Sequence, residues 1–150
     1  MPASTNRGRL ERLRASEAER AVFGLTTEDD LLHYVRNTAG LARFLYYHPT
    51  YSIKGPSGFP DVVLVHRETG RTIIAELKRE GLWPTADRLK AGRFLQGQRT
   101  WLQALSKGPT EAYLWWPSDS RDIADILTDG PRPEMRCVRR LREWLARPTP

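Results

Sequence analysis

The sequence lacks most of the features that mark disulfide-bonded, zinc-binding and membrane proteins. Its 150 residues include one cysteine, Cys137, which excludes an intramolecular disulfide and a cysteine-based zinc site. No apolar run approaches the length of about eighteen residues that spans a membrane, so we expect no membrane partner. The polar N-terminus lacks the apolar stretch of a secretory signal. We therefore expect an intracellular, cytoplasmic protein, in keeping with a bacterial or phage-infected cell.

Positive charge is what the chain has in excess. Lys and Arg number 24 and Asp and Glu 18, which gives a formal net charge of +6. Such a balance favours a polyanionic partner, although on charge alone a merely soluble basic protein is an equal alternative. At this length we expect one domain with a substantial core.

The most informative stretch is a predicted β-hairpin. Two apolar, β-branched runs at residues 62–66 and 71–78 flank a turn that contains glycine. A turn centred midway between the runs places Asp61 directly opposite Glu76, with their Cβ atoms roughly 4.5–5.5 Å apart. Lys78 follows Glu76 by two residues and therefore points to the same face of the strand. The hairpin thus gathers two carboxylates and an ammonium at one end.

Such a cluster predicts a metal site. Two adjacent carboxylates repel each other unless a cation neutralises them. Mg²⁺ prefers oxygen ligands and needs one or two carboxylates, and Mn²⁺ accepts the same ligands. A bound metal acidifies a water and stabilises charge on a phosphoryl oxygen, while Lys78 orients that water or holds a phosphate. Asp61, Glu76 and Lys78 therefore predict metal-assisted hydrolysis of a phosphodiester.

These residues resemble the signature of a known enzyme group. Pro60-Asp61, followed after fourteen residues by Glu76-Leu77-Lys78, resembles the PD-(D/E)xK nuclease superfamily. The longer match is similar to its VRR-NUC branch of small virus-type and repair-associated nucleases. Six segments follow the order of that family over roughly residues 26–127: Thr26-Thr27-Glu28, Tyr47-His48-Pro49, Gly58-Phe59-Pro60-Asp61, Ala75-Glu76-Leu77-Lys78, Gln98 with Trp101-Leu102, and Tyr113-Leu114-Trp115-Trp116-Pro117-Ser118-Asp119.

The resemblance implies roles for the central residues. Asp61 and Glu76 would bind Mg²⁺, or Mn²⁺, with the Leu77 carbonyl as a further ligand. Lys78 would orient the attacking water. The expected activity is that of a metal-dependent endodeoxyribonuclease.

Two further catalytic residues are implied by the resemblance alone. Glu28 opens a helix predicted to be capped by Thr26 or Thr27, and in the family a glutamate here helps to hold the metal, directly or through water. Its alternative role is to complement the helix dipole. His33 stands where many relatives have glutamine, a departure from the family pattern. Gln98 is expected to support Lys78 or a phosphate, whereas an ordinary surface glutamine is the alternative.

The residues before and after the hairpin are candidates for contact with DNA. His48 and Lys54 have the chemistry to bind phosphate, and Tyr51 to stack on a base or sugar. Residues 79–92 form an insertion relative to the family, predicted as a flap over the DNA that carries Arg79 and Trp83. An ordinary structural role is an equal alternative for these residues, and Trp83 can equally pack the insertion down.

The predicted fold is α/β. Helices are expected at residues 10–23, 26–40, 93–107, 118–130 and 133–147, and strands at 43–48, 62–66, 71–78 and 111–116. This order matches the restriction-endonuclease-like αβββαβ core, a mixed four-stranded sheet flanked by helices, with an extra helix at each terminus. The expected organisation is a basic N-terminal arm (1–24), a VRR-NUC-like nuclease domain (25–130) and a basic amphipathic helix (131–150) packed on that domain.

The resemblance also suggests a substrate. Some small VRR-NUC nucleases resolve Holliday junctions as symmetric homodimers, which suits the two-fold symmetry of a four-way junction. We therefore expect a Mg²⁺-dependent, structure-specific endonuclease acting on branched DNA as a homodimer. The alternatives are a nuclease for flaps, nicks or linear duplex, and a non-catalytic DNA-binding module that keeps the fold.

Overall fold

A computed structural model describes residues 27–49 and 58–148 of the chain. Its centre is a four-stranded sheet with the strand order β1-β2-β3-β6. The strands are β1 (Phe44–Tyr47), β2 (Val62–His66), β3 (Thr72–Leu77) and β6 (Glu111–Trp115). Neighbours β1, β2 and β3 are antiparallel, whereas β6 joins β3 in parallel after a helical crossover. The protein is therefore a mixed α/β fold, as predicted.

The β2–β3 hairpin has the predicted register. Val62 pairs with Ala75, and Val65 pairs with Thr72. Continuing this register by one residue places Asp61, which lies just before β2, opposite Glu76. β3 is an interior strand with partners on both sides. The candidate residues therefore lie at the ends of interior strands and not on an edge strand.

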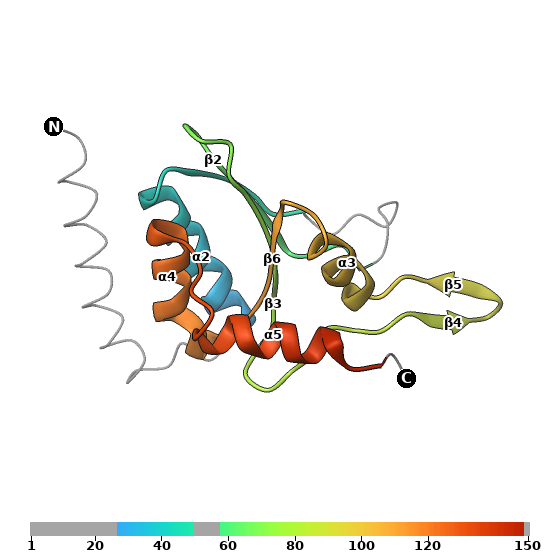
Figure 1. Ribbon diagram of the computed structural model, residues 1–150. Helices are drawn as coiled ribbons and strands as arrows, with labels where there is room; N and C mark the ends of the chain where they lie inside the picture. The colour runs from blue at the N-terminus through green and yellow to red at the C-terminus, as the bar shows by residue number, and fades with distance from the viewer. Residues whose placement is uncertain (1–26, 50–57, 149–150) are drawn as a thin grey trace, which may run out of the picture.

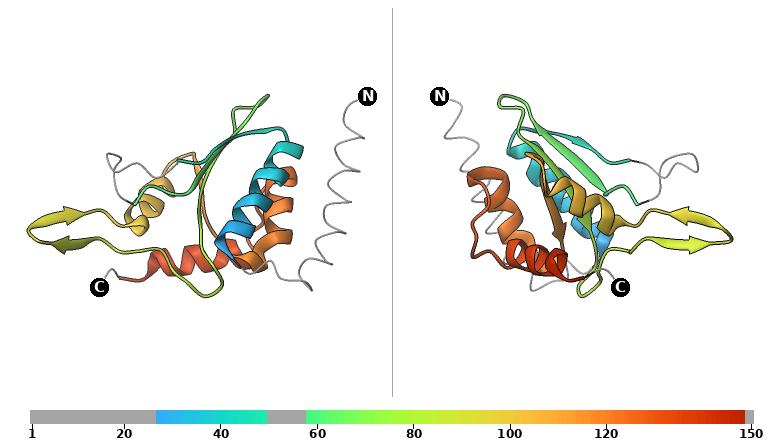
Figure 2. Two further views of the ribbon diagram at one scale, coloured as in Figure 1. Left: turned by 180° about the vertical axis from the view of Figure 1, so that it is seen from behind. Right: turned by 45° about the vertical axis from the view of Figure 1, so that its right-hand side comes forward.

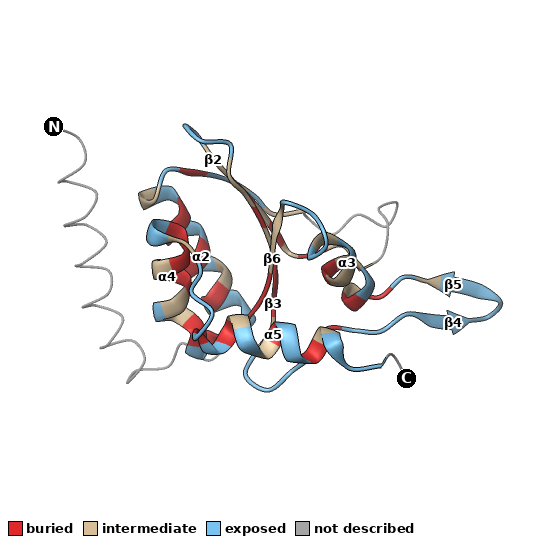
Figure 3. Cartoon of the chain, viewed as in Figure 1, coloured by how far each residue is buried: buried red, intermediate tan, exposed pale blue. Residues whose placement is uncertain are grey.

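Helices cover both faces of the sheet (Figure 1). On one face lie α2 (Glu28–Leu41) and α4 (Ser120–Asp129), which follows the short 3₁₀ helix η1 (Pro117–Asp119). On the other face lie α3 (Gln98–Leu105) and the end of α5 (Arg136–Ala146). Each of the four α-helices carries both buried and exposed residues (Figure 3).

The two faces carry separate hydrophobic clusters. The larger cluster joins α2 and α4 to the sheet through fully buried residues such as Leu31, Leu64, Ile73 and Ile126. The smaller cluster joins α3, β6 and α5 and consists of Leu102, Leu114, Leu141 and Trp144. None of the helices in the described part of the chain is long and apolar enough to cross a bilayer.

Two helix ends follow the predicted signals. Thr27 caps α2, since its Oγ1 accepts a hydrogen bond from Asp30 N at 3.0 Å and Asp30 Oδ2 accepts one from Thr27 N at 3.4 Å. Gly130 follows α4 with φ of 92°, a conformation that glycine adopts without strain. The predicted N-terminal arm and residues 50–57, which include Tyr51 and Lys54, lie outside the described residues.

The helix predicted at residues 93–107 is wrong in its first part. The helix there, α3, begins at Gln98, while β4 (Arg88–Lys90) and β5 (Arg93–Leu95) pair as an antiparallel ribbon. Ala91 and Gly92 connect them with φ of 51° and 73°, as in the type I′ turns that are common in hairpins with two-residue loops. This ribbon projects away from the sheet (Figures 1 and 2). Phe94 is therefore 65% exposed instead of buried under a helix.

Candidate active site

Glu76 is the most deeply buried of the predicted site residues. It lies near the end of β3, and its side chain is only 1% exposed. Its Oε2 atom has no hydrogen-bond partner among the described residues. A buried carboxylate with an unsatisfied oxygen is destabilising unless another group binds it.

Asp61 is held beside Glu76 by its own backbone and by β3. Its Oδ2 accepts a hydrogen bond from Leu77 N at 2.8 Å. The Asp61 carbonyl oxygen lies 2.6 Å from His48 Nδ1, which therefore carries the proton and donates it. Gly58 has φ of 84°, and a Cβ there would lie 2.6 Å from Gln96 O, so glycine is needed for the approach to Asp61.

Lys78 and Gln98 meet at one oxygen of Glu76. Lys78 Nζ lies 3.3 Å from Glu76 Oε1, and Gln98 Nε2 donates to the same atom at 2.5 Å. Gln98 is predicted to support Lys78, and in the structure it acts on Lys78 only through the carboxylate that they share. Glu76 Oε1 is thus saturated, whereas Oε2 remains available.

The buried carboxylate is held in its neutral form. Burial raises the pKa of Glu76 to about 9, and the neighbouring charge of Asp61 adds to this effect, while Lys78 opposes it. One ammonium therefore does not neutralise the carboxylate pair. A hard divalent cation would, because it favours the ionised form of both carboxylates and takes oxygen ligands. The residues present fit such a cation.

Glu28 stands apart from this pair. It opens α2, and its Oε1 accepts a hydrogen bond from Arg79 N at 3.4 Å. Within residues 27–49 and 58–148, Glu28, Asp61 and Glu76 do not bring three ligand atoms close enough to share one metal ion directly. A role for Glu28 through water remains a prediction.

The predicted DNA-contacting residues have different surroundings. Trp83 packs the insertion down, because its ring lies 5.3 Å from both Trp116 and Trp144. Its side chain nevertheless remains 39% exposed. Arg79 is exposed and uses its backbone N–H to contact Glu28, while Tyr51 and Lys54 lie outside the described residues.

Two residues that the sequence analysis missed hold Gln98 in place. Thr85 N donates to Gln98 Oε1 at 3.1 Å, and Gln98 N donates to Thr85 Oγ1 at 3.4 Å. Asp87 Oδ1 accepts from Gly97 N at 2.5 Å and from Thr100 Oγ1 at 2.8 Å. The only local signal for this arrangement was Gly92 between two short basic runs, and it is weak because alanine at position 91 does not favour the positive φ of this turn.

A basic hollow lies beside the insertion. It has a volume of about 450 Å³ and is lined by Trp83, Trp116, Arg136, Arg139, Arg140, Glu143 and Arg147. Arg140 forms an ion pair with Asp119, and its Cζ lies over the ring of Trp116 at 3.8 Å from the ring centroid. The other three arginines have no ion-pair partner within the described residues, so the hollow carries unneutralised positive charge.

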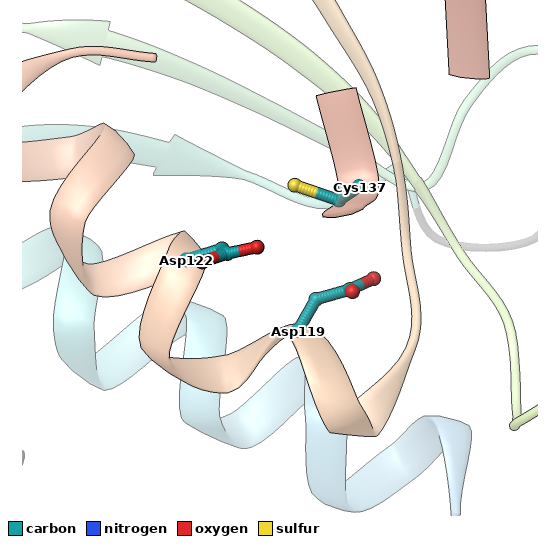
Figure 4. Close-up of side chains that lie close together, drawn as sticks. All are labelled: Asp119, Asp122 and Cys137. Carbon is teal, nitrogen blue, oxygen red and sulfur yellow. The ribbon is translucent and has the colours of Figure 1, made fainter. Parts of the chain in front are cut away.

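A second acidic group forms at the start of α4. Asp119, Asp122 and Cys137 bring three ligand atoms within 4.8 Å of one another (Figure 4). However, Asp119 already binds Arg140 and accepts from Trp116 N at 2.7 Å. Burial raises the pKa of Cys137 to about 12, so the thiol stays protonated. This group is accounted for by packing between η1, α4 and α5.

The chain matches no protein-family model, no curated protein and no solved structure.

Proposed function

We propose that the protein is a Mg²⁺-dependent endonuclease that hydrolyses phosphodiester bonds in DNA, of the PD-(D/E)xK type. The observation that carries the proposal is the buried Glu76 beside the half-buried Asp61, with Lys78 Nζ 3.3 Å from Glu76. A buried carboxylate next to a second one, with an oxygen that has no hydrogen-bond partner among the described residues, has a physical explanation if a divalent cation binds there. Mn²⁺ is an alternative ion because it accepts the same ligands.

Each residue has a separate task in the proposed reaction. Asp61 and Glu76 would hold the metal, and by resemblance the Leu77 carbonyl would be a further ligand. When bound, the metal would acidify a water and stabilise charge on the phosphoryl oxygens. Lys78 orients the water or holds the scissile phosphate as a point charge. Gln98 fixes the orientation of Glu76 through its hydrogen bond to Oε1.

Positive charge around the site supports a polyanionic substrate. The α5 hollow, which is the basic hollow lined by Trp83 and the α5 arginines, contributes four arginines and one glutamate. Its two tryptophans offer ring surface for a base, and guanidinium groups match phosphate oxygens bidentately. Trp83 is five residues from Lys78, so the chain itself keeps their Cα atoms within about 18 Å. A DNA strand in the active site would therefore pass near this hollow.

The preferred substrate is proposed to be branched DNA, bound by a homodimer. This part of the proposal rests on the resemblance to junction-resolving nucleases. A nuclease for flaps, nicks or linear duplex uses the same site, and a cleavage assay separates these cases. A non-catalytic DNA-binding module is the alternative from another class.

The test is a cleavage assay on four-way-junction, flap, linear duplex and single-stranded DNA. It is run with Mg²⁺, with Mn²⁺ and with chelator. Asp61→Asn and Lys78→Ala are expected to lower cleavage by at least about a hundredfold, because the first removes a charge from the metal site and the second removes the ammonium. Lys107→Ala, which removes an exposed lysine beyond the end of α3, is the control and is expected to cleave normally.

The outcomes separate the candidate functions. Paired symmetric cuts in the junction support the dimeric resolvase, whereas cuts only in flap or linear DNA retain the site and discard the junction. Binding that weakens steeply with salt, without cleavage under any metal, supports the binding module. Cleavage that survives in Asp61→Asn and Lys78→Ala places the chemistry elsewhere.

A further inference from the structure

The β4–β5 ribbon has two chemically different faces. Leu89 is paired directly with Phe94, so both side chains lie on one face. Lys90 is paired with Arg93, and Arg88 with Leu95, so the opposite face carries three cations and the half-buried Leu95. The apolar face is solvent-exposed, with Leu89 74% and Phe94 65% exposed.

An exposed ribbon of this kind is energetically unfavourable when no ligand is bound to it. Two strands of three residues each bury little and are marginally stable in water by themselves. Two large apolar side chains that are largely exposed to solvent add a further cost. Residues 88–95 contain three cations and no acidic residue, so neighbouring like charges repel along the basic face.

Hydrogen bonds join the two legs of the ribbon at its base, and the tip projects away from the rest of the domain (Figure 2). Asp87 Oδ1 and Thr85 O accept hydrogen bonds from Gly97 N and Arg99 N, which clamps the two legs together. The legs are so close that a Cβ on Gly97 would overlap the carbonyl carbon of Ala86. The ribbon is therefore held at a fixed position relative to the domain.

The clamp also connects the ribbon to the candidate active site. Thr85 N donates to Gln98 Oε1, and Gln98 Nε2 donates to Glu76 Oε1. Two hydrogen bonds thus separate the foot of the ribbon from the buried carboxylate. A ligand on the ribbon would be held in a defined register with the site.

We propose that the ribbon is a wedge for the branch point of DNA. Its apolar face packs on the exposed face of the last base pair of one arm, and its basic face contacts the phosphates of the next arm. A branch point offers both surfaces side by side, since the end of a base-pair stack is flat and apolar while the adjoining backbone is anionic. This inference specifies the substrate class of the proposed nuclease and rests on that function only for its biological setting.

A second copy of this chain is a poorer occupant of the ribbon. Pairing two such ribbons through their apolar faces would leave the three cations on the outer face of each ribbon without an acidic partner in either ribbon. Lying flat in one groove of linear duplex is also less favourable, because only one face would meet the DNA closely. The segregation of the two faces therefore points to a ligand that presents an apolar surface and phosphates to opposite sides.

The test measures binding without cleavage. Full-length protein carrying Lys78→Ala is titrated, in the presence of chelator, with a three-way junction and with a linear duplex of the same number of phosphates. Adding Phe94→Ser or Leu89→Ser is expected to weaken junction binding about tenfold, as removal of one stacking side chain does, and to leave duplex binding within about twofold. Leu45→Ser, on the half-exposed edge strand β1, is the matched control.

A base analogue whose fluorescence rises on unstacking, placed beside the branch point, gives a second readout. The rise is expected with Lys78→Ala alone and is expected to disappear when Phe94→Ser is added. The proposal is overturned if the Lys78→Ala protein binds the junction with the same affinity with and without Phe94→Ser. A sedimentation experiment in which Phe94→Ser converts a dimer to a monomer also overturns it. None of these measurements requires hydrolysis. If the ribbon binds junctions in this way but the wild-type protein cuts no DNA, the wedge is supported and the nuclease is rejected.

Discussion

Gln98 donates its hydrogen bond to Glu76 Oε1 over 2.5 Å. This contact fixes which oxygen of the buried carboxylate is occupied, and Lys78 lies on the same atom. Oε2 is then the oxygen that remains for a metal ion. Much of the expected behaviour of the site follows from this one-sided arrangement.

Replacing Gln98 is expected to loosen Glu76 without removing any charge. Gln98→Ala leaves Glu76 Oε1 with Lys78 alone and frees Thr85 N. We expect metal affinity and cleavage rate to fall about 10- to 100-fold, as for other groups that orient a metal ligand. Titration calorimetry with Mg²⁺ and single-turnover kinetics measure the two effects. Gln103→Ala, in the same helix, is the control, and an equal decrease in that variant would show that the helix rather than the hydrogen bond is responsible.

The pH dependence of stability should reveal the buried proton on Glu76. The unfolded carboxyl ionises at its ordinary pKa near 4.5, whereas the folded one keeps its proton up to a pKa of about 9. Between these values the native state binds one more proton than the unfolded chain, so this group makes unfolding easier as pH rises. The slope is at most about 1.4 kcal/mol per pH unit, and it levels off above the folded pKa.

The measurement compares urea unfolding of wild type and Glu76→Gln between about pH 6 and pH 9 in chelator. We expect the variant to gain stability relative to wild type as pH rises. Mg²⁺ is expected to oppose the trend, because it binds the ionised carboxylate and its affinity therefore increases with pH. A constant difference between the two proteins across this range would mean that Glu76 ionises normally.

Two glycines should respond in opposite ways to alanine. Gly97→Ala forces a Cβ against the backbone of Ala86 and Thr85, so we expect the free energy of unfolding to fall by about 2 kcal/mol or more. We also expect the binding of branched DNA by the ribbon to be abolished. Gly40→Ala places its methyl in open space within α2, so we expect a gain of up to about 1 kcal/mol. Chemical denaturation of both variants measures the difference, and similar values for the two would contradict the close approach at Gly97.

The hairpin was predictable because its signals are local. Two apolar, β-branched runs, a glycine in the turn and the length of the runs specify the register, which brings Asp61 opposite Glu76. The saturation of Glu76 Oε1 was not predictable, because it depends on where Gln98 stands in space. The spacing of Phe94 and Leu95 continues toward Trp101, and it therefore favours a helix where the structure has a strand.

Residues 93–95 form a strand instead of the predicted helix because of the backbone conformation of Ala91 and Gly92. Both adopt positive φ, and alanine gives little indication of that conformation from sequence. Likewise, the ion pair between Arg140 and Asp119 joins η1 to α5 across twenty-one residues and follows no periodic pattern. Long-range polar contacts therefore account for most of what the sequence left open.

The α5 hollow should contribute to DNA affinity through charge. Arg136→Ala and Arg139→Ala together remove two guanidiniums that have no ion-pair partner among the described residues. We expect weaker binding to every DNA tested and a salt dependence of log K that is shallower by about 0.9 for each phosphate that the protein no longer neutralises. Arg142→Ala removes one charge from α5 but faces a different hollow, so it is the control for the change in slope per arginine removed. An equal change in slope for Arg142→Ala would mean that net charge alone acts.

The Arg140–Asp119 pair should be structural rather than metal-binding. Asp119 is 3% exposed, and its Oδ1 accepts from Arg140 at 3.2 Å while Oδ2 accepts from Trp116 N at 2.7 Å. Asp119→Ala leaves a largely buried guanidinium without its carboxylate, so we expect the free energy of unfolding to fall by about 3–5 kcal/mol. Asp125→Ala, which breaks a pair with the solvent-exposed Arg132, is expected to lower it far less. If chelator lowered the melting temperature of wild type by as much as Asp119→Ala does, and left that variant unchanged, Asp119 would be a metal ligand instead.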